Sequence, residues 1–345
     1  MSAVDSRTVT VKEAISRVTR AIKANRPLFL WGPPGVGKSE LCQGIVDSGA
    51  LGKAKLIDIR ASLLDPTDVR GFPAPDVENN RMIWLPPVDF PTEEEAAQYD
   101  TILILFDELN SGAQSVQAAL YQLILNGRVG QYVLPKNVRI VAAGNRESDK
   151  GVTYRMPTPL ANRFVHLEIR ADFEAWLDWA VTNKINEDVV GYISFAKADL
   201  FDFDPRSSGH AFATPRAWTF VSQFCDEKDI TDAELTDLVA GTVGEGAATE
   251  FKGFVKIYQD LPKIQDIVRS PDTVIIPNEP SIRYAISGLV ANNMTDTNIK
   301  PLFNFIKRLP KEFQVLTLRI ALKRNPELLQ NELLKDWIQE NAENM

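Results

Sequence analysis

Cysteine and histidine are scarce in this sequence. Its 345 residues include two cysteines, Cys42 and Cys225, and two histidines, His166 and His210. Two widely separated cysteines are too few for a disulfide framework or a four-ligand zinc site, and we expect both to be small buried hydrophobic residues. Two histidines leave little material for a histidine metal centre or a Ser-His-Asp triad. The composition therefore excludes those classes of enzyme.

Long apolar runs are also missing. No stretch approaches the ~20 apolar residues that a membrane-spanning helix requires, and the first residues, MSAVDSRTVTVKEA, have no apolar core behind a basic start. We therefore expect no membrane association, no signal or transit peptide, and a cytoplasmic location. The formal net charge of -8 disfavours broad, sequence-independent binding to nucleic acid, although an acidic chain can still contain a local basic channel.

Short apolar runs alternate with helical segments through about residue 170. The runs are residues 28 to 31, 55 to 59, 102 to 106, 138 to 143 and 164 to 169. Runs this continuously apolar are typical of strands buried on both faces of a parallel sheet, with helices as crossover connections. A first helix is predicted after Thr10, because Glu13 completes a capping box. Its buried face is predicted to carry Val11, Ala14, Ile15, Val18 and Ile22. This part is predicted to be an α/β unit.

Beyond residue 170 the strand signals thin out. Apolar residues there recur at helical spacing, as in Phe173, Trp176 and Leu177. The length also exceeds what one ordinary core fills, so more than one domain is expected. We predict an α/β core over residues 1–170 and a mostly helical remainder.

A glycine-rich segment separates the first predicted strand of the sheet from a helix. LFLWGPPGVGKSELC satisfies the pattern G-x-x-x-x-G-K-[ST] through Gly32, Gly37, Lys38 and Ser39. A backbone that wraps a polyphosphate must turn its N–H groups inward, which requires glycine, and the helix start adds partial positive charge. Lys38 is predicted to contact the β- and γ-phosphates of ATP, and Ser39 to ligate Mg²⁺. The other predicted nucleotide-binding residues of the loop are Pro33, Pro34, Gly35 and Val36. The alternative is a strand-to-helix turn without a ligand.

Two carboxylates follow another predicted strand, in TILILFDELN. Asp107 and Glu108 stand at its carboxyl end, the edge at which open α/β sheets bind ligands. Asp107 is predicted to hold Mg²⁺ through water, and Glu108 to orient or deprotonate the attacking water. A solvated acidic turn is the alternative for this pair.

Further segments carry a resemblance to a known family. VRIVAAGN ends in Asn145, MPTPLANRF contains Arg163 just before a strand, and ATPRAW places Arg216 at a predicted helix start. Together with GPPGVGKS and FDELN, this order resembles the AAA+ ATPases, and the wording of the segments is similar to their MoxR branch. The resemblance is dense over residues 10 to 220 and weak beyond about 230.

The resemblance implies roles for these residues. Asn145 would position the lytic water, Arg216 would touch the γ-phosphate from a helical lid, and Arg163 would complete a neighbouring subunit's site as an arginine finger. A planar, permanently charged arginine suits that last role. Arg155 is a rival for the finger. Arg146 stands where the family more often has proline, which leaves the geometry of that loop open. The structural alternatives are a strand-end cap for Asn145, a surface ion pair for Arg163 and a helix-start salt bridge for Arg216.

The resemblance also implies an organisation. It predicts a five-stranded parallel sheet in the family's order, a helical lid over residues 171–228 and an accessory helical region over residues 229–345. A finger supplied in trans implies a homo-oligomeric ring, expected to be a hexamer. Two hairpins are predicted, one within residues 63–87 with Phe72 and Trp84 on its arms, and one within residues 127–137 that contains Tyr132. Simple core packing is the alternative for these aromatic residues.

The leading hypothesis is therefore an Mg-dependent, ring-forming ATPase that remodels or activates a partner protein, as the resemblance to MoxR relatives suggests. The partner is expected to carry a von Willebrand A-type domain. The first alternative is an AAA+ nucleic-acid motor or loader, which a basic cluster near the carboxyl end favours. Its members are Lys307, Arg308, Lys311, Arg319, Lys323 and Arg324. These cations otherwise indicate solvated helix faces. A small-molecule kinase is a further alternative, although it needs neither Asn145 nor an Arg163 acting in trans.

Overall fold

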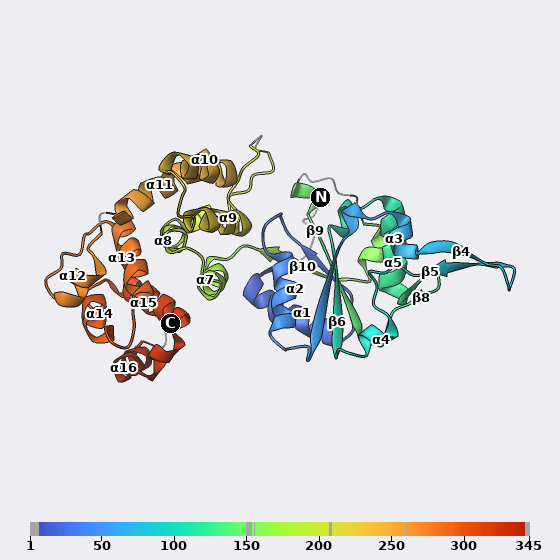
Figure 1. Cartoon of the computed structure of the whole chain (residues 1–345), viewed down its shortest axis with the longest axis horizontal. Helices are drawn as coiled ribbons and strands as arrows, with labels where there is room; N and C mark the ends of the chain where they lie inside the picture. Colours follow the sequence, from blue (N-terminus) through green and yellow to red (C-terminus); the bar gives the residue numbers. More distant parts are fainter. Residues whose placement is uncertain (1–6, 150–153, 155, 207–208, 260, 342–345) are drawn as a thin grey trace. The chain divides into compact units, whose positions relative to one another are not determined.

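The chain forms two compact units, Met1–Ala171 and Asp172–Met345 (Figure 1). The computed structural model describes residues 7–149, 154, 156–206, 209–259 and 261–341. The boundary between the units lies beside the predicted change of architecture near residue 170. The further division into a lid and an accessory region at residue 228 stays a prediction.

A parallel sheet forms the centre of the first unit. Its six strands lie in the order β1-β10-β2-β9-β6-β3. Their bounds are β1 (Arg7–Thr10), β2 (Leu28–Trp31), β3 (Ala54–Arg60), β6 (Thr101–Asp107), β9 (Val138–Gly144) and β10 (Val165–Arg170). The prediction of five strands is wrong by one, because β1 pairs with β10 at the edge of the sheet. This strand is short and runs directly into a helix, so its alternating pattern is too brief to stand out in the sequence.

Helices cover both faces of this sheet. The helices of the unit are α1 (Val11–Lys23), α2 (Lys38–Asp47), α3 (Pro66–Arg70), α4 (Glu93–Ala96), α5 (Gln114–Asn126) and α6 (Thr158–Ala161). Side chains alternate along each strand, so Leu103 and Leu105 of β6 pack in the core of α1 and α2, whereas Ile104 packs in the core of α5. Burial on both faces explains why the strands are continuously apolar.

The first helix begins as predicted. The Thr10 hydroxyl accepts a hydrogen bond from the Glu13 N–H, and the Glu13 carboxylate accepts one from the Thr10 N–H, which completes the capping box. Ala14, Val18 and Ile22 are buried, but Ile15 is 42% exposed, so its predicted place on the buried face is wrong. The buried stripe on this helix is narrower than predicted.

Two antiparallel hairpins project from this scaffold, and both predictions are confirmed. In the first, β4 (Phe72–Asp76) pairs with β5 (Arg81–Leu85), and the hairpin extends away from the rest of its unit (Figure 1). In the second, β7 (Arg128–Val129) pairs with β8 (Tyr132–Val133). Phe72 is exposed, so core packing does not account for it.

The second unit is helical where the structure describes it. Its helices are α7 (Phe173–Thr182), α8 (Glu187–Phe195), α9 (Pro215–Cys225), α10 (Asp232–Val243), α11 (Glu245–Gln259), α12 (Ile264–Arg269), α13 (Pro280–Asn292), α14 (Ile299–Ile306), α15 (Lys311–Arg324) and α16 (Glu332–Glu340). One hydrophobic core, which includes Trp218 and Phe305, joins residues from both sides of residue 228. Cys225 is only partly buried, unlike the fully buried Cys42, so the prediction of a buried thiol is wrong for Cys225.

No helix in the described ranges combines the length and the apolar character that a membrane span requires.

Candidate active site

The glycine-rich segment forms a loop between β2 and α2. Gly37 precedes the first turn of α2 with a φ of 95°, a conformation that residues with a side chain rarely adopt. Gly32 lies so close to β10 that a Cβ atom would be 2.9 Å from the carbonyl oxygen of Ile169. These two positions therefore require glycine for different reasons, one for backbone conformation and one for close approach.

Lys38 is buried at the start of α2, and its ammonium group turns back into the loop. The Nζ atom donates hydrogen bonds to the carbonyl oxygens of Gly32 (2.8 Å) and Pro33 (3.1 Å). It also donates to Oδ1 of Asn145, at 3.3 Å. The lysine cation thus lies between the glycine-rich loop and the end of β9.

Ser39 and Asp107 meet beside the loop. The Ser39 hydroxyl donates a hydrogen bond of 2.9 Å to Oδ2 of Asp107, the last residue of β6. The other oxygen, Oδ1, accepts a bond of 2.8 Å from the N–H of Glu108. A hydroxyl and a carboxylate at this separation fit Mg²⁺, which usually takes one or two protein ligands and completes its shell with water and phosphate oxygens.

Glu108 has an unusual backbone. Its φ of 54° and ψ of 32° lie in the left-handed region, which is uncommon for residues with a side chain. Its carboxylate accepts a hydrogen bond of 2.5 Å from the hydroxyl of Ser62, which follows β3. Neither feature has a signal in the sequence, and Ser62 was not among the predicted site residues.

Asn145 follows the last residue of β9. Its carbonyl oxygen accepts a bond of 2.8 Å from Nδ2 of Asn110. Asn110 is buried and packs so closely on Gly144 that a Cβ atom there would be 2.1 Å from Oδ1 of Asn110. Asn110 is the last residue of the FDELN segment, so this motif could have indicated it as a site residue. Its partner, the carbonyl of Asn145, has no signal in the sequence.

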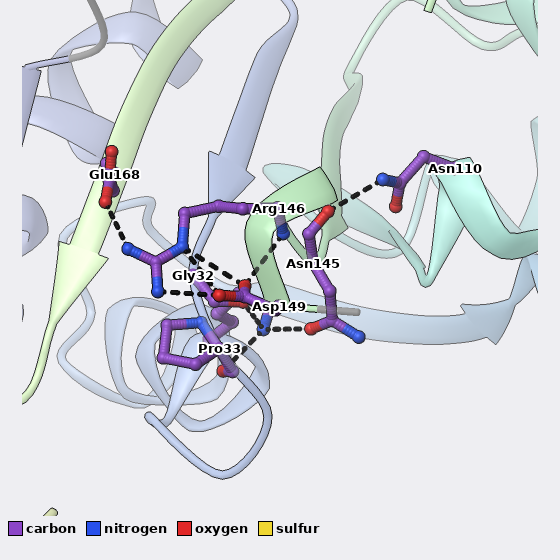
Figure 2. Close-up of polar contacts among 8 residues, drawn as sticks. Gly32, Pro33, Asn110, Asn145, Arg146, Asp149 and Glu168 are labelled. Carbon is purple, nitrogen blue, oxygen red and sulfur yellow. Dashed lines mark hydrogen bonds and ion pairs between the residues drawn. The ribbon is translucent and has the colours of Figure 1, made fainter. Parts of the chain in front are cut away.

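Arg146, Asp149 and Glu168 form an ion-pair network beside this loop (Figure 2). Nη2 of Arg146 lies 2.7 Å from Oδ1 of Asp149, and Nη1 lies 2.6 Å from Oε1 of Glu168. The hydrogen bonds to Asp149, together with the one to Glu168, outweigh burial and hold the pKa of Arg146 above its usual value. In the sequence, Arg146 stands out only as an arginine at a position where the resembling family more often has proline.

His166 has a structural position next to the site. Its Nδ1 accepts a 2.9 Å bond from the indole N–H of Trp31, and its Nε2 lies 2.7 Å from the carbonyl oxygen of Ala161. Because Nδ1 accepts from Trp31, Nε2 is the ring nitrogen that donates to Ala161.

Two of the predicted arginines are exposed. Arg163 is exposed just before β10, at the opposite end of that strand from Glu168. Arg216 is exposed in the first turn of α9, in the second unit, and Thr214 caps that helix. Arg155, the rival finger, lies outside the described residues.

Comparisons with known proteins give distant similarities. No known protein-family model matches the chain. Over 182 residues the chain is 28% identical to midasin of Giardia intestinalis, and the aligned part covers 50% of this chain and 4% of midasin. The chain therefore spans only a small part of that relative's length.

The chain is also similar to solved structures, of which two are described. One is a candidate ATPase from Cytophaga hutchinsonii, with 15% identity, a TM-score of 0.37 and coverage of 98% of this chain and 90% of that chain. The other is NtrX from Brucella abortus in complex with ADP, with 13% identity, a TM-score of 0.41 and coverage of 93% and 67%. Both similarities are too distant to indicate a function.

Proposed function

We propose that this protein is an Mg²⁺-dependent, AAA+-type ATPase that works as a homo-oligomeric ring. One observation carries the proposal. Lys38 contacts Asn145, and Ser39 contacts Asp107, so residues from the ends of two strands, β9 and β6, converge on the glycine-rich loop that follows β2. A glycine-rich turn without a ligand would need neither a buried lysine nor an acid beside its serine.

The loop suits the triphosphate of ATP. Its backbone and the start of α2 offer N–H groups and partial positive charge, and Lys38 adds a full charge. The bonds that Lys38 donates to carbonyl and amide oxygens can be replaced by bonds to phosphate oxygens, which are stronger because both partners are then charged. Lys38 would therefore bind and orient the β- and γ-phosphates.

Ser39 and Asp107 would hold Mg²⁺, the serine directly and the aspartate through water. When bound, the metal ion would neutralise charge on the phosphate oxygens. The hydrogen bond between the two side chains keeps both aimed at one point beside the loop.

Glu108 and Asn145 would act on the attacking water. The carboxylate of Glu108 would accept its proton, while the amide of Asn145 would fix its direction toward the terminal phosphate. The left-handed backbone of Glu108 and its bond to Ser62 hold the carboxylate in a defined place next to Asp107. Such strain is frequent at functional sites.

Arg163 would act on a neighbouring subunit. It lies in the turn before β10, and Val165, two positions further on, pairs with Leu28 at the start of β2, whereas the glycine-rich loop follows the other end of β2. Arg163 therefore lies toward the end of β2 that is remote from its own glycine-rich loop. Its exposure fits a finger that reaches another copy, and Arg216 would contact the γ-phosphate from the helical unit.

The finer assignment rests on the resemblance to MoxR proteins. We infer that the ring is hexameric and remodels or activates a partner protein, one that carries a von Willebrand A-type domain. The hairpin of β4 and β5 supports a protein partner, because Phe72, Val77 and Met82 are exposed on it.

The basic cluster near the carboxyl end gives little support to the nucleic-acid alternative. Arg319 is paired with Glu174 and Asp178, and Lys323 with Asp178. Arg308 donates to the carbonyl oxygens of Pro271 and Val274. Arg319 and Lys323 are thus paired with carboxylates of their own unit and offer little charge to phosphate backbones.

Phosphate release from Mg·ATP tests the proposal. The parent is expected to turn over, Lys38→Ala to lose ATP binding, and Glu108→Gln to bind ATP but to hydrolyse it at least about 100-fold more slowly. Lys53→Ala, a change at an exposed lysine of the same unit, serves as the control. Equal hydrolysis by Glu108→Gln and the parent would contradict the role of Glu108. Absence of turnover in the parent would refute ATPase function itself.

The partner protein is identified by a separate capture experiment, with Glu108→Gln loaded with ATP as the bait.

A further inference from the structure

The side chain of Asn145 depends on a short piece of backbone. Its Oδ1 accepts from Lys38 at 3.3 Å, and its carbonyl oxygen accepts from Asn110 at 2.8 Å. Both contacts require a fixed main-chain path immediately after β9. The carbonyl is held from one side by Asn110, and the path beyond it is set by the residue that follows, Arg146.

Arg146 is bound through several of its nitrogens. Its N–H donates to Oδ2 of Asp149 at 2.9 Å, and Nε and Nη2 donate to Oδ1 of Asp149 at 3.0 and 2.7 Å. Nη1 donates to Glu168 at 2.6 Å. The side chain of Asp149 is only 2% exposed, and that of Glu168 is 19% exposed. The guanidinium therefore bridges a carboxylate of its own loop, Asp149, and a carboxylate of β10, Glu168.

The order of the strands shows which parts of the sheet this guanidinium connects. β2 lies between β9 and β10, with Trp31 paired to Gly144 on one side and to Glu168 on the other. Gly32, the first residue of the glycine-rich loop, follows Trp31 directly. Arg146 thus ties the loop after β9 to β10 across the end of the strand that carries the glycine-rich loop (Figure 2).

We propose that Arg146 is a positioning residue for ATP hydrolysis: its bonds to Asp149 and Glu168 fix the segment 145–149 and thereby hold the Asn145 amide beside Lys38. This inference rests on the proposed ATPase function. It assigns a task to the position at which the chain carries arginine instead of proline. Proline would restrict the same backbone through its ring, whereas arginine restricts it through charged hydrogen bonds.

An ion pair that only stabilised the fold would differ from a positioning residue in its effects on measured stability and rate. A stabilising pair would lower the thermal stability and leave turnover per folded molecule unchanged. A positioning residue that acts through Asn145 lowers kcat, and its effect disappears once Asn145 is removed. A planar fork is also required, so lysine should not fully replace arginine at this position.

Steady-state hydrolysis by the full chain decides between these cases. Arg146→Gln is expected to lower kcat by about 10-fold or more, with little change in the Kd for a non-hydrolysable ATP analogue, since a misplaced group costs rate more than binding. Arg146→Lys should recover only part of that rate, and Glu168→Gln should lose part of it. In an Asn145→Ala background, Arg146→Gln should cost less than about 2-fold further.

Arg17→Ala is the matched control. Arg17 lies in the same unit, has an ion pair with Glu13 and shares with Arg146 a side-chain exposure of 35%. It should leave kcat unchanged. Full activity of Arg146→Gln, or equal multiplicative losses in the parent and Asn145→Ala backgrounds, would overturn the proposal. Should Arg146→Gln fail to fold, Arg146→Lys and Glu168→Gln carry the same test.

Amide hydrogen exchange separates this inference from the proposed function, because it needs no turnover. Peptides that cover residues 138–149 should take up deuterium faster in Arg146→Gln than in the parent, while peptides over residues 102–109 and the Arg17→Ala protein stay unchanged. If the parent hydrolyses no ATP, the proposed function fails and exchange alone decides whether Arg146 fixes this segment. Unchanged uptake would overturn the inference in either case.

Discussion

Glu108 illustrates how a single residue is placed by its backbone as well as its side chain. A left-handed conformation at a residue with a Cβ costs roughly 1–3 kcal/mol, and Glu108 holds it between the buried strand β6 and the bond to Ser62. The type of residue was predictable from FDELN, because an acid after a buried strand is a local pattern. The conformation was not, since Ser62 is 46 positions away in the chain.

Asp188 is a residue outside the candidate site whose ionisation affects stability. It lies in the first turn of α8, where burial, with a smaller contribution from Glu187, raises its pKa to about 6. The folded form therefore keeps the proton at pH values at which the unfolded chain, with a pKa of 3.8, has released it. The free energy of unfolding should fall as the pH rises from about 4 to about 6.

Asp188→Asn removes this ionisation. The variant should lose part of the pH dependence and should gain about 1–3 kcal/mol over the parent at pH 7 relative to pH 4. Urea unfolding followed by tryptophan fluorescence at several pH values measures the change. Asp237→Asn, at an exposed position of the same unit, should keep the parental slope. A parental slope in Asp188→Asn would contradict the assignment.

At the scale of elements, ion pairs connect α7 with α15. Arg319 of α15 is paired with Glu174 and Asp178 of α7, and Lys323 shares Asp178. Burial alone would raise the pKa of Asp178, but hydrogen bonds from Arg319 and Lys323 outweigh it and lower the pKa. The stabilisation from Asp178 is therefore present above the ordinary pKa of an aspartate and is lost as the pH falls.

Arg319→Ala should weaken the contact between these helices. Its loss leaves Asp178 half-buried with one cation, so we expect a loss of about 1–3 kcal/mol in the stability of the helical unit. Differential scanning calorimetry would report the change. Arg206→Ala removes the highly exposed pair with Asp204 and should shift the transition little. Equal shifts for the two variants would show that burial adds nothing to the Arg319 pair.

Local patterns explain which elements were predictable. Five strands of the sheet, the helix capped by Thr10 and both hairpins have signals within a few residues, such as continuous apolar runs and turn residues. β1, with the sequence RTVT, is not a continuous apolar run, and its pairing with β10 joins residues about 160 positions apart. The same limit holds in the site. The glycine-rich loop, Asp107 and Glu108 follow local motifs, whereas the partnership of Arg146 with Glu168 exists only once β9 and β10 flank β2.

At the scale of the whole molecule, the decisive question is whether one copy completes the site of the next. Lys38 and Arg163 would then serve different sites although they belong to one chain. A heterologous, head-to-tail ring interface repeats the same contact at each boundary between subunits. Two inactive proteins with different defects can in that case restore each other's sites.

Mixing Lys38→Ala with Arg163→Ala tests this arrangement. Each protein alone should be inactive, while an equal mixture should form intact sites at about a quarter of the boundaries, where an intact loop faces an intact finger. Hydrolysis that appears only on mixing, and sizing of the assemblies by light scattering with Mg·ATP, are the measurements. A mixture as inactive as its components would contradict a finger at Arg163. Arg155→Ala in place of Arg163→Ala examines the rival.

The outermost strand of the sheet has a practical consequence for such assembly measurements. β1 covers the open side of β10 through pairs from Arg7 with Leu167 to Thr10 with Arg170. A shortened chain that starts after Thr10 would leave the main-chain groups of β10 uncovered, and uncovered strands recruit other polypeptides. Self-association of that shortened chain would then come from pairing between uncovered β10 strands. It would resemble nucleotide-driven oligomers in a sizing experiment.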